Sequence, residues 1–587
     1  MRRKLIYLIS GAILLGLSIL LYPSDFDKTP PTLYYNANII TIDEELPKAE
    51  AMLVVDGLIK DIGQLESIDT TGFKDLIRRD LQGATLMPGF IDVHTHFALS
   101  MFLSKMVDLS GFKHDSNEAV WQYLREVVEQ AAPDEWIVCK GLDPILVPDL
   151  VVPDLKFLDQ IAPEHPIVIF SQSLHSYWAN TKAFEAVGIT ANTPDPSDLS
   201  YYEKDDSGNL TGLIVEQEAF QPFGEKLTSV VLTPKVLSLA AADVMRQYAQ
   251  NGNTTIVSTG LTINDSKPLL LLKHLSAERS SFLGGALQKL GQLPIRKPAP
   301  RHFIYMRHDR SHLLPDKRGE ANDFYDVVGV KHWYDGSPYI GSMYLDSSYL
   351  NTEMTSEVLH ISPDSRGHAL VDEDSLKAFI QAYHEAGWQI AIHTQGDAAI
   401  KEVVDAYEEL ASTLDFSQSR HRLEHCLLLP TSELERLKQL NLFPSYHINH
   451  IYYYGDALAA SLLGEERSQQ VLPLKSSQEA GIVSTLHADQ PMFESKPFRL
   501  IQTAMERKTK NGKVLGSKEG IDLMDAIKSL TINAAVQINK EDQIGSLKTG
   551  KYADFIILDT NPFSIPVDRL EQINCREAYI NGNLVDF

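Results

Sequence analysis

The chain has 587 residues, of which 44% are hydrophobic and 22% charged, a globular composition that excludes a collagen-like, a wholly disordered or a multi-span membrane protein. Lys and Arg number 53 against 78 Asp and Glu, so the formal net charge is −25 at pH 7. This acidic balance, with no block rich in Lys or Arg, argues against nucleic acid as a partner, because phosphate binding needs clustered cations.

The first 24 residues are predicted to direct the chain to a membrane. Cations at positions 2–4 precede an apolar run over 5–21, and Asp25 and Asp27 follow it, so we expect the N-terminus to stay in the cytoplasm while the rest crosses. The run is short against the roughly 20 residues that span a bilayer, yet no small-x-small cleavage site follows it. An uncleaved anchor in the bacterial inner membrane, with the rest of the chain in the periplasm, is therefore favoured over a cleaved signal peptide with a secreted body, or a helix buried in the fold.

Short β-like runs at both ends of the chain predict one small sheet domain. They occupy 33–42, 51–62 and 80–86 near the start, and 554–558 and 578–585 near the end. The early runs are separated by turn residues and indicate an antiparallel unit, and Asn581-Gly582 is typical of a tight hairpin turn. We expect residues 32–90 and 540–587 to form this composite domain together.

Between these ends, helices alternate with short apolar strands. Each helix has apolar residues at i, i+3 and i+4, and each following strand is a short apolar burst. The pairs are 234–250 with 254–258, 374–386 with 389–393, 398–412 with 421–426, 432–440 with 442–447, and 474–480 with 482–487. This alternation predicts βα units and a parallel sheet. Residues 99–232, with a helix over 118–131, indicate an insertion, and residues 261–322, rich in Pro, Gly and basic residues, show no clear pattern.

A His-x-His pair closes the most distinctive segment of the chain. The segment reads Leu86-Met87-Pro88-Gly89-Phe90-Ile91-Asp92-Val93-His94-Thr95-His96. Side chains at i and i+2 of a strand point to the same face, so the apolar strand places both imidazoles where they can bind one metal ion together. Two surface or core histidines are the structural alternative.

Further polar residues stand at the ends of later apolar strands. They are Lys331 after 327–330, His393 after 390–392, Glu424 and His425 after 422–423, and Asp489 after 484–488. The carboxyl ends of barrel strands meet at one mouth, so these side chains are expected to lie close together. Taken singly, a histidine could be a hydrogen-bonded core residue, Lys331 an ion-paired lysine and Asp489 a helix N-cap. Their combination favours a metal site.

On these residues the chain resembles the amidohydrolase superfamily, and within it the amidohydrolase family 3 (YtcJ-like hydrolases). The resemblance depends on residues 87–96, on Lys331 with 335–337, on His393 with 396–397, on 424–425, on 487–489 and on 545–554. It extends over nearly all residues after 32. It implies an α/β fold with a TIM-like (β/α)8 barrel over 91–539, interrupted by the insertion, and a composite β-sandwich built from both chain ends.

The resemblance also implies a centre of two divalent metal ions, most often zinc. In this sequence His94 and His96 would hold one ion, His393 and His425 the other, and Lys331 would bridge them as a carbamate, which offers anionic oxygens where an ammonium has no lone pair. Such metals lower the pKa of bound water to about 7, and Asp489 would take its proton and pass it to the leaving nitrogen. We therefore expect hydrolysis of a carbon–nitrogen bond other than a peptide bond, in an N-acyl, N-formyl or cyclic amide of small size.

Two further histidines are candidates for contact with the substrate. His175 and His450 each lie in a segment that is similar to the family, and they would polarise or orient the substrate carbonyl; loop packing with hydrogen-bonded imidazoles is the alternative. The tyrosines at 452–454 favour a substrate with an apolar or aromatic part. His487 would line the pocket. Cys426, one of three cysteines without CxxC spacing, would point away from the metal face and pack.

Three alternatives stay open from the sequence. A mononuclear aminohydrolase, or deaminase, would use the same barrel with one ion. A membrane-tethered regulatory relative would keep the barrel without turnover, and a purely structural protein would bind no metal. The substrate is set by the insertion and by loops whose sequence pattern does not indicate a ligand. The sequence also leaves open which metal is bound and whether copies of the chain form a homo-oligomer.

Overall fold

The computed structural model describes residues 29–198, 200–315 and 322–587. The membrane-directed segment predicted over residues 1–24 lies outside this part. The chain divides into two compact units. The first contains the described residues up to Ala98 together with Ala241–Asn351 and Pro363–Phe587, and the second contains Leu99–Ala240 and Thr352–Ser362.

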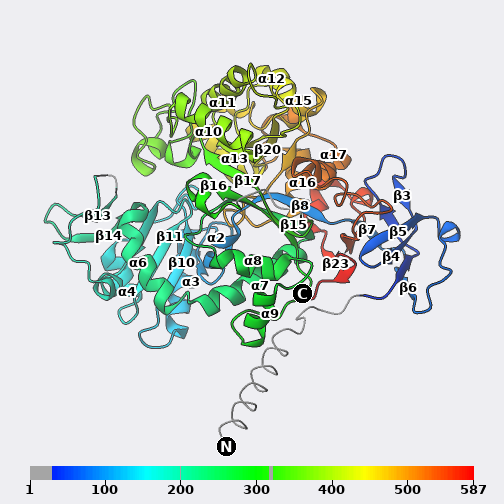
Figure 1. The fold of residues 1–587 in the computed structure, drawn as a ribbon. Coiled ribbons are helices and arrows are strands. Elements are labelled where there is room, and N and C mark those ends of the chain that lie inside the picture. The colour runs from blue at the N-terminus through cyan, green and yellow to red at the C-terminus, as the bar shows by residue number, and fades with distance from the viewer. Residues whose placement is uncertain (1–28, 199, 316–321) are drawn as a thin grey trace, which may run out of the picture. The chain divides into compact units, whose positions relative to one another are not determined.

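Eight parallel strands form a barrel in the first unit (Figure 1). In order along the sheet they are β8 (Phe90–Thr95), β15 (Asn253–Leu261), β16 (Arg301–Arg307), β17 (Tyr325–Trp333), β18 (Gln389–Thr394), β19 (Arg422–His425), β20 (Phe443–Tyr446) and β21 (Thr485–Leu486). A bridge between Thr95 and Gln490 returns the chain after β21 to β8, so the sheet nearly closes. Every residue of β8 and β18 is buried, as expected for parallel strands covered on both faces. The predicted TIM-like barrel is confirmed.

Helices precede five of these strands where the alternation predicts them. They are α7 (Pro234–Gln250), α10 (Glu373–Glu385), α11 (Asp397–Leu410), α12 (Leu434–Gln439) and α15 (Leu474–Glu479). The start of α10 shows why its bounds are sharp: the Asp372 carboxylate accepts a hydrogen bond from the backbone N–H of Ser375 at 2.8 Å, and acidic residues fill the first turn, where the helix dipole favours them.

Residues 261–322, which showed no pattern in the sequence, contain a barrel strand. Within them lie α8 (Lys267–Ser276), α9 (Phe282–Lys289) and β16. Arginines bracket β16, which is typical of a surface segment, but Arg301 is fully buried because Asp554 pairs with its guanidinium at 2.5 Å. Its partner is 253 residues away, so no local pattern could indicate that this cation belongs to the core.

Two sheets built from both ends of the chain pack together as the predicted composite β-sandwich. One has the order β5 (Leu58–Gly63), β4 (Ala51–Val55), β1 (Thr32–Tyr35), β6 (Ile77–Asp80); the other β24 (Asn583–Leu584), β23 (Cys575–Ile580), β22 (Phe555–Leu558), β7 (Thr85–Pro88), β2 (Asn38–Ile40), β3 (Lys48–Ala49). Their shared core includes Met52 and Val54 from the first sheet and Leu86 and Phe555 from the second.

The early strands do not form the purely antiparallel unit that the sequence predicted. β1 pairs with β6 in parallel, and β2 pairs with β7 in parallel. The reason is that the β4–β5 hairpin intervenes and supplies a connection long enough for the chain to return in the same direction. The predicted turn at Asn581-Gly582 is confirmed: both residues have positive φ, 51° and 71°, as a two-residue hairpin loop requires.

The second unit has its own six-stranded sheet, which the sequence did not predict. Its order is β13 (Tyr201–Lys204), β14 (Leu210–Val215), β12 (Ser176–Ala179), β11 (Ile167–Ser171), β10 (Ile137–Leu142), β9 (Val107–Asp108). The helices α3 (Asn117–Gln130), α4 (Leu155–Ile161), α5 (Thr181–Val187) and α6 (Glu216–Val230) accompany it. The helix predicted over 118–131 corresponds to α3.

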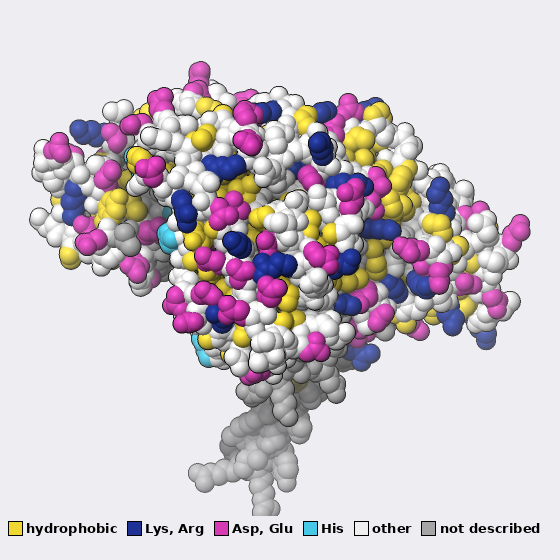
Figure 2. All heavy atoms as spheres, turned by 90° about the horizontal axis from the view of Figure 1, so that it is seen from above, with side chains coloured by type: hydrophobic (Ala, Val, Ile, Leu, Met, Phe, Trp, Pro, Cys, Tyr) yellow, Lys and Arg dark blue, Asp and Glu magenta, His cyan; other side chains and the backbone are white. Residues whose placement is uncertain are grey.

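Acidic, basic and apolar side chains are mixed over the face that Figure 2 shows. Within the described residues no single helix is long and apolar enough to cross a bilayer; one sharply bent pair, α6 with α7, meets the test by length and composition alone.

Candidate metal centre

Histidines and one aspartate meet at the carboxyl ends of the barrel strands. His94 and His96 come from the end of β8, His425 from β19, and Asp489 follows β21. Nε2 of His96 lies 3.0 Å from Oδ1 of Asp489, and Nε2 of His94 lies 3.5 Å from the same oxygen. These three residues offer donor atoms within 4.8 Å of one another, close enough to share one cation.

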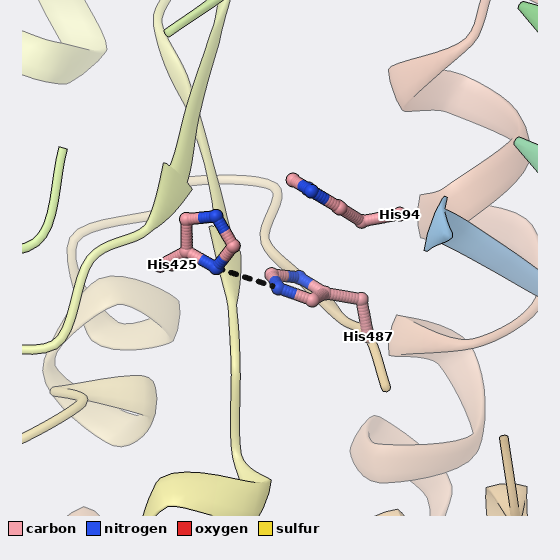
Figure 3. Close-up of side chains that lie close together, drawn as sticks. All are labelled: His94, His425 and His487. Carbon is pink, nitrogen blue, oxygen red and sulfur yellow. Dashed lines mark hydrogen bonds between the residues drawn. The ribbon is translucent and has the colours of Figure 1, made fainter. Parts of the chain in front are cut away.

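A second set of donors shares His94 with the first. It comprises His94, His425 and His487. The His94 and His487 rings are stacked with centroids 4.6 Å apart, and Nε2 of His487 lies 3.3 Å from Nδ1 of His425 (Figure 3). The sequence assigned His487 only to the pocket wall, whereas the structure adds it to the donors.

A third set joins His425 and Asp489 to His447, whose Nδ1 lies 3.9 Å from Oδ2 of Asp489. The sequence analysis missed His447 as a donor, although it stands directly after β20 just as His425 ends β19. The three sets overlap in His94, His425 and Asp489, so they form one continuous group of donors, which we call the donor cluster.

His393 lies beside the donor cluster without entering any of the three sets found in the described part of the chain. Its ring centroid is 4.3 Å from that of His425, but its Nε2 lies 3.3 Å from the carbonyl oxygen of Gly336 and 3.2 Å from the side-chain nitrogen of Gln395. The structure thus places this residue near the expected second ion, with its nitrogen engaged by neighbours.

Lys331 is fully buried in β17, and its Nζ has no hydrogen-bond partner among the described residues. Burial lowers the pKa of Lys331 to about 8, against the opposing pull of Glu424 and Asp489. Buried ammonium groups normally have partners, so an amine that is easily deprotonated and unsatisfied is suited to chemical modification or to a ligand. The bridging role that the family resemblance implies for Lys331 stays a prediction.

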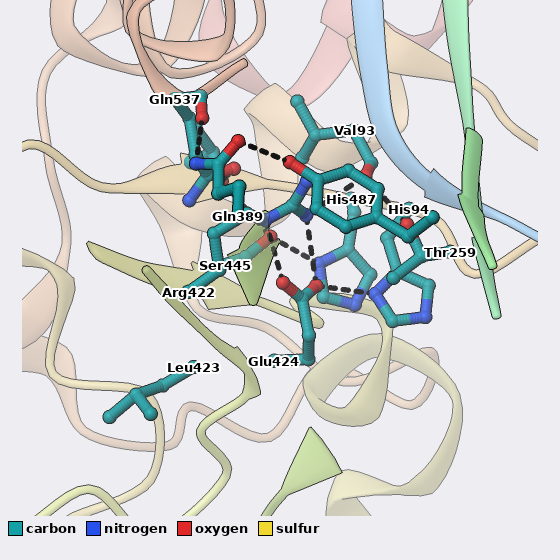
Figure 4. A network of polar contacts seen from close by, with 12 residues as sticks. Val93, His94, Thr259, Gln389, Arg422, Leu423, Glu424, Ser445, His487 and Gln537 are labelled. Carbon is teal, nitrogen blue, oxygen red and sulfur yellow. Dashed lines mark hydrogen bonds and ion pairs between the residues drawn. The ribbon is translucent and has the colours of Figure 1, made fainter. Parts of the chain in front are cut away.

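A buried carboxylate fixes how His94 is oriented. Nδ1 of His94 donates to Oε2 of Glu424 at 2.5 Å, and Nε of Arg422 lies 2.7 Å from Oε1 of Glu424 (Figure 4). Arg422 in turn donates to the carbonyl of Val93, in the strand that carries His94, at 2.9 Å. With Nδ1 protonated, the lone pair of His94 is on Nε2, which has no hydrogen-bond partner in the described structure. The sequence analysis placed Glu424 at a strand end beside His425 but assigned it no role in the site.

Electrostatics keep the donors in the forms that bind cations. Burial lowers the pKa of His94, His425 and His487 well below the ordinary value, so these imidazoles are neutral and have free lone pairs. Burial raises the pKa of Asp489, but His96, His447 and Lys331 together outweigh it, and the pKa lies below the ordinary value. Neutral imidazoles beside an anionic carboxylate, with buried donor atoms unsatisfied, fit a divalent cation.

Backbone strain is concentrated at the same place. His425, Cys426 and Asp489 all have positive φ, at 73°, 50° and 61°. Each residue in this backbone region lowers the stability of the fold by on the order of 1–3 kcal/mol. The surrounding packing must offset this cost. The thiol of Cys426 is buried and contacts the carbonyl of Leu423 at 3.3 Å, apart from the donor sets.

The two histidines predicted to contact substrate lie in different units. Nδ1 of His450 lies 2.5 Å from the hydroxyl of Tyr339, and its ring centroid is 4.2 Å from that of His447, so it flanks the donor cluster. Burial lowers the pKa of His450 to about 4. His175 belongs to the second unit, where Nδ1 lies 2.9 Å from Oε1 of Glu216. Its role stays a prediction.

A parallel βα barrel with His and Asp donors at its carboxyl mouth defines a metal-binding barrel protein of the hydrolase type. The amidohydrolase family profile matches residues 79–586, and the chain belongs to this family.

Similar proteins extend over almost the whole chain. YtcJ of Bacillus subtilis (strain 168), named as an amidohydrolase, is 26% identical over 568 residues, covering 94% of this chain and 99% of YtcJ. The N-substituted formamide deformylase of Arthrobacter pascens is 23% identical over 567 residues, covering 94% and 97%. The crystal structure of an uncharacterized metal-dependent hydrolase from Pyrococcus horikoshii OT3 superposes with a TM-score of 0.70 at 23% identity, covering 92% of this chain and 99% of that one. This likeness confirms the fold.

Proposed function

We propose that the chain hydrolyses a carbon–nitrogen bond of a small amide, with N-formyl and N-acyl amides as the first candidates and cyclic amides next. The observation that carries the proposal is the set of buried, unsatisfied donor atoms at the barrel mouth, above all Nε2 of His94 and Nζ of Lys331. The similarity to a protein named as an N-substituted formamide deformylase supports the choice of substrate class.

The residues that would hold divalent cations, with zinc as the proposed metal, follow from the donor sets. His94, His96 and Asp489 would hold one ion, and His425 with His447, His487 or His393 the other. Lys331 would bridge them as a carbamate, formed when its neutral amine adds carbon dioxide. When bound, such an ion supplies Lewis acidity, which lowers the pKa of a coordinated water to about 7 and polarises an amide carbonyl.

Asp489 is proposed to move the proton. Its carboxylate is anionic because its pKa lies below the ordinary value, and it stands between His96 and His447, so it can accept a proton from the attacking water. The same carboxyl then delivers the proton to the amide nitrogen as the carbon–nitrogen bond breaks, which releases the amine and restores the carboxylate.

Neighbouring residues would orient the substrate. The hydrogen bond between His450 and Tyr339 holds that imidazole beside the donor cluster, where it can direct a polar atom at the substrate carbonyl. Tyr453 stacks on Phe493 at 5.0 Å between ring centroids, and Phe493 packs against His447 at 5.0 Å. These rings favour a substrate with an apolar or aromatic group. His175 is proposed for the same task.

A mononuclear aminohydrolase is the second candidate, and one observation favours it. Nε2 of His393 is engaged by Gly336 and Gln395. If His393 keeps these contacts in the metal-loaded protein, the centre has one ion held by His94, His96 and Asp489. Hydrolysis would then take place at an imine-like ring carbon of the substrate.

For location we propose that residues 5–21 anchor the chain in the inner membrane, with the barrel outside the cytoplasm; cleavage would make the same body a secreted protein.

The test is a hydrolysis screen with the full-length protein loaded with zinc. N-formyl, N-acyl and cyclic amides, with aromatic or aliphatic substituents, are compared with amino-substituted heterocycles, and the Asp489→Asn variant provides the blank. We expect the unchanged protein to release amine from amides and the Asp489→Asn variant to release none. Ammonia release from the heterocycles alone would replace the proposal by the aminohydrolase.

A further inference from the structure

An exposed apolar hairpin stands out in the first unit. It consists of residues 280–297, contains α9, and is called the α9 hairpin below. Four large apolar side chains in it are half or more exposed: Phe282 57%, Leu283 53%, Leu290 64% and Ile295 76%. Isolated exposed apolar residues are ordinary, but several within one short segment mark a surface that meets something apolar.

The α9 hairpin is an ordered element. Its small residues face the protein, and its large apolar side chains face outward. Ser281 caps α9 by accepting from the N–H of Gly284 at 3.0 Å, and the small residues Gly284, Gly285 and Ala286 form its buried face. The return segment is held by Arg296 N–H, which donates to the side chain of Gln288 at 3.2 Å.

The hairpin is basic in an acidic protein. It has three cations, Lys289, Arg296 and Lys297, and no acidic residue, whereas the whole chain has a net charge of −25. Lys289 is exposed, and exposed Arg279 directly precedes the hairpin. Exposed Glu278 precedes Arg279, and Asp586 pairs with Lys297. Since charges are screened beyond about 8 Å at physiological salt, the charges of this segment count for more in binding there than the net charge of the whole chain. Apolar side chains bordered by cations are typical of an element lying in the headgroup region of a bilayer.

The hairpin also lies where the described chain begins. The backbone N–H of Thr29 donates to the side-chain oxygen of Asn583 at 3.2 Å. Asn583, Arg296 and Lys297 are among the residues that line a small cavity of about 70 Å³. Lys297 pairs with Asp586 at 2.6 Å, which joins the hairpin to the C-terminal segment.

We propose that the α9 hairpin docks on the surface of a lipid bilayer that contains anionic headgroups. Phe282, Leu283, Leu290 and Ile295 enter the acyl boundary, and Arg279 and Lys289 meet the phosphates. The apolar run over 5–21 supports this occupant, because only residues 22–28 separate it from Thr29, which is the eighth residue after the run. Eight residues reach at most about 29 Å, so a run embedded in a bilayer would keep Thr29, and the hairpin beside it, close to the lipid surface.

The experiment separates the hairpin from the predicted anchor. The full-length chain carries Leu14→Arg and Leu15→Arg, which make insertion of the run unfavourable, and its partition is measured by flotation. The vesicles contain phosphatidylcholine mixed with phosphatidylglycerol, with pure phosphatidylcholine vesicles for comparison. In this background, the variant Phe282→Ser, Leu283→Ser, Leu290→Ser, Ile295→Ser is expected to lower the partition coefficient at least about tenfold. The matched control, Ile77→Ser, Val514→Ser, Phe563→Ser, removes exposed apolar residues of the same unit outside the hairpin and should leave it unchanged.

A charge variant covers the case in which the apolar variant does not fold. Arg279→Gln with Lys289→Gln should lower binding to the phosphatidylglycerol vesicles about fivefold per charge and leave pure phosphatidylcholine binding unaffected.

Three results would overturn the proposal. The first is equal binding of the serine variant and its control. The second is a dimer in solution that the serine substitutions dissociate without affecting vesicle binding, which would assign the hairpin to a second copy of the chain. The third is faster amide exchange of residues 280–297 in the lipid-free Leu14→Arg, Leu15→Arg protein than in the lipid-free unchanged protein. This would show that residues 5–21 cover the hairpin.

Discussion

Glu424 accepts the Nδ1 proton of His94 across 2.5 Å, and neither side chain is exposed to solvent. The two residues are 330 positions apart in the sequence, yet their pairing decides which nitrogen of His94 faces the donor cluster. Arg422 compensates the charge of Glu424 and ties it to the strand of His94. The metal-binding form of the centre therefore depends on a buried charge pair outside it.

Replacing Glu424 by Gln should weaken metal binding. The amide keeps the shape but loses the charge that orients His94, so we expect metal affinity to fall about 10–100-fold, measured by chelator competition. Glu433→Gln is the matched control, because Glu433 is also largely buried and pairs with Arg436 at 2.6 Å away from the donors. Glu433→Gln should lower the free energy of unfolding and leave metal affinity unchanged. Equal metal affinity in both variants would contradict the orienting role.

Lys331→Ala should reduce the metal content of the purified protein. A bridging carbamate would be lost with the amine, and short carboxylates such as formate or acetate should restore part of the metal by taking its place. Lys540→Ala removes another buried lysine, paired with Asp323 at 2.8 Å, and should leave metal content unchanged. A Lys331→Ala protein that holds two ions without added carboxylate would refute the bridge.

Asp489→Asn should retain most of its metal while losing turnover. The amide can still coordinate through its oxygen but cannot accept a proton, so kcat should fall about 10²–10⁴-fold. Metal content and kcat are measured on the same preparation, so that loss of metal is not mistaken for loss of the base. Rates near those of the unchanged protein would remove the role assigned to Asp489.

Breaking the contact between barrel and β-sandwich should destabilise the protein without touching the metal. Arg301 is fully buried between the rings of Phe324 and Tyr552 and pairs with Asp554 at 2.5 Å. Asp554→Ala leaves the charge of Arg301 buried and unpaired. This should lower the free energy of unfolding, measured with denaturant, by about 3–5 kcal/mol. Asp586→Ala breaks the exposed pair with Lys297 and should leave the free energy of unfolding nearly unchanged. Similar losses in both would contradict this reading of Arg301.

The sequence indicated the parts of the fold and site that local pattern encodes. Alternating helices and apolar strands predicted the barrel, and residues at strand ends, such as His94, Lys331 and Asp489, could be placed together because parallel strands end at one mouth. What it missed depends on distant partners. The segment that contains β16 showed no pattern in the sequence, because Arg301 belongs to the core only through its pairing with Asp554. Glu424 showed its role only through His94. His447 follows its strand as His425 does, and that signal was available but unused.

The most direct test of the central claim is elemental analysis of the full-length protein, purified without chelators, beside His96→Ala and the control His312→Ala, a histidine outside the donor cluster. We expect two divalent ions per chain in the unchanged and control proteins and a clear loss in His96→Ala. Metal content in His96→Ala equal to that of the control, or no bound metal in any of the three proteins after incubation with zinc, would contradict it.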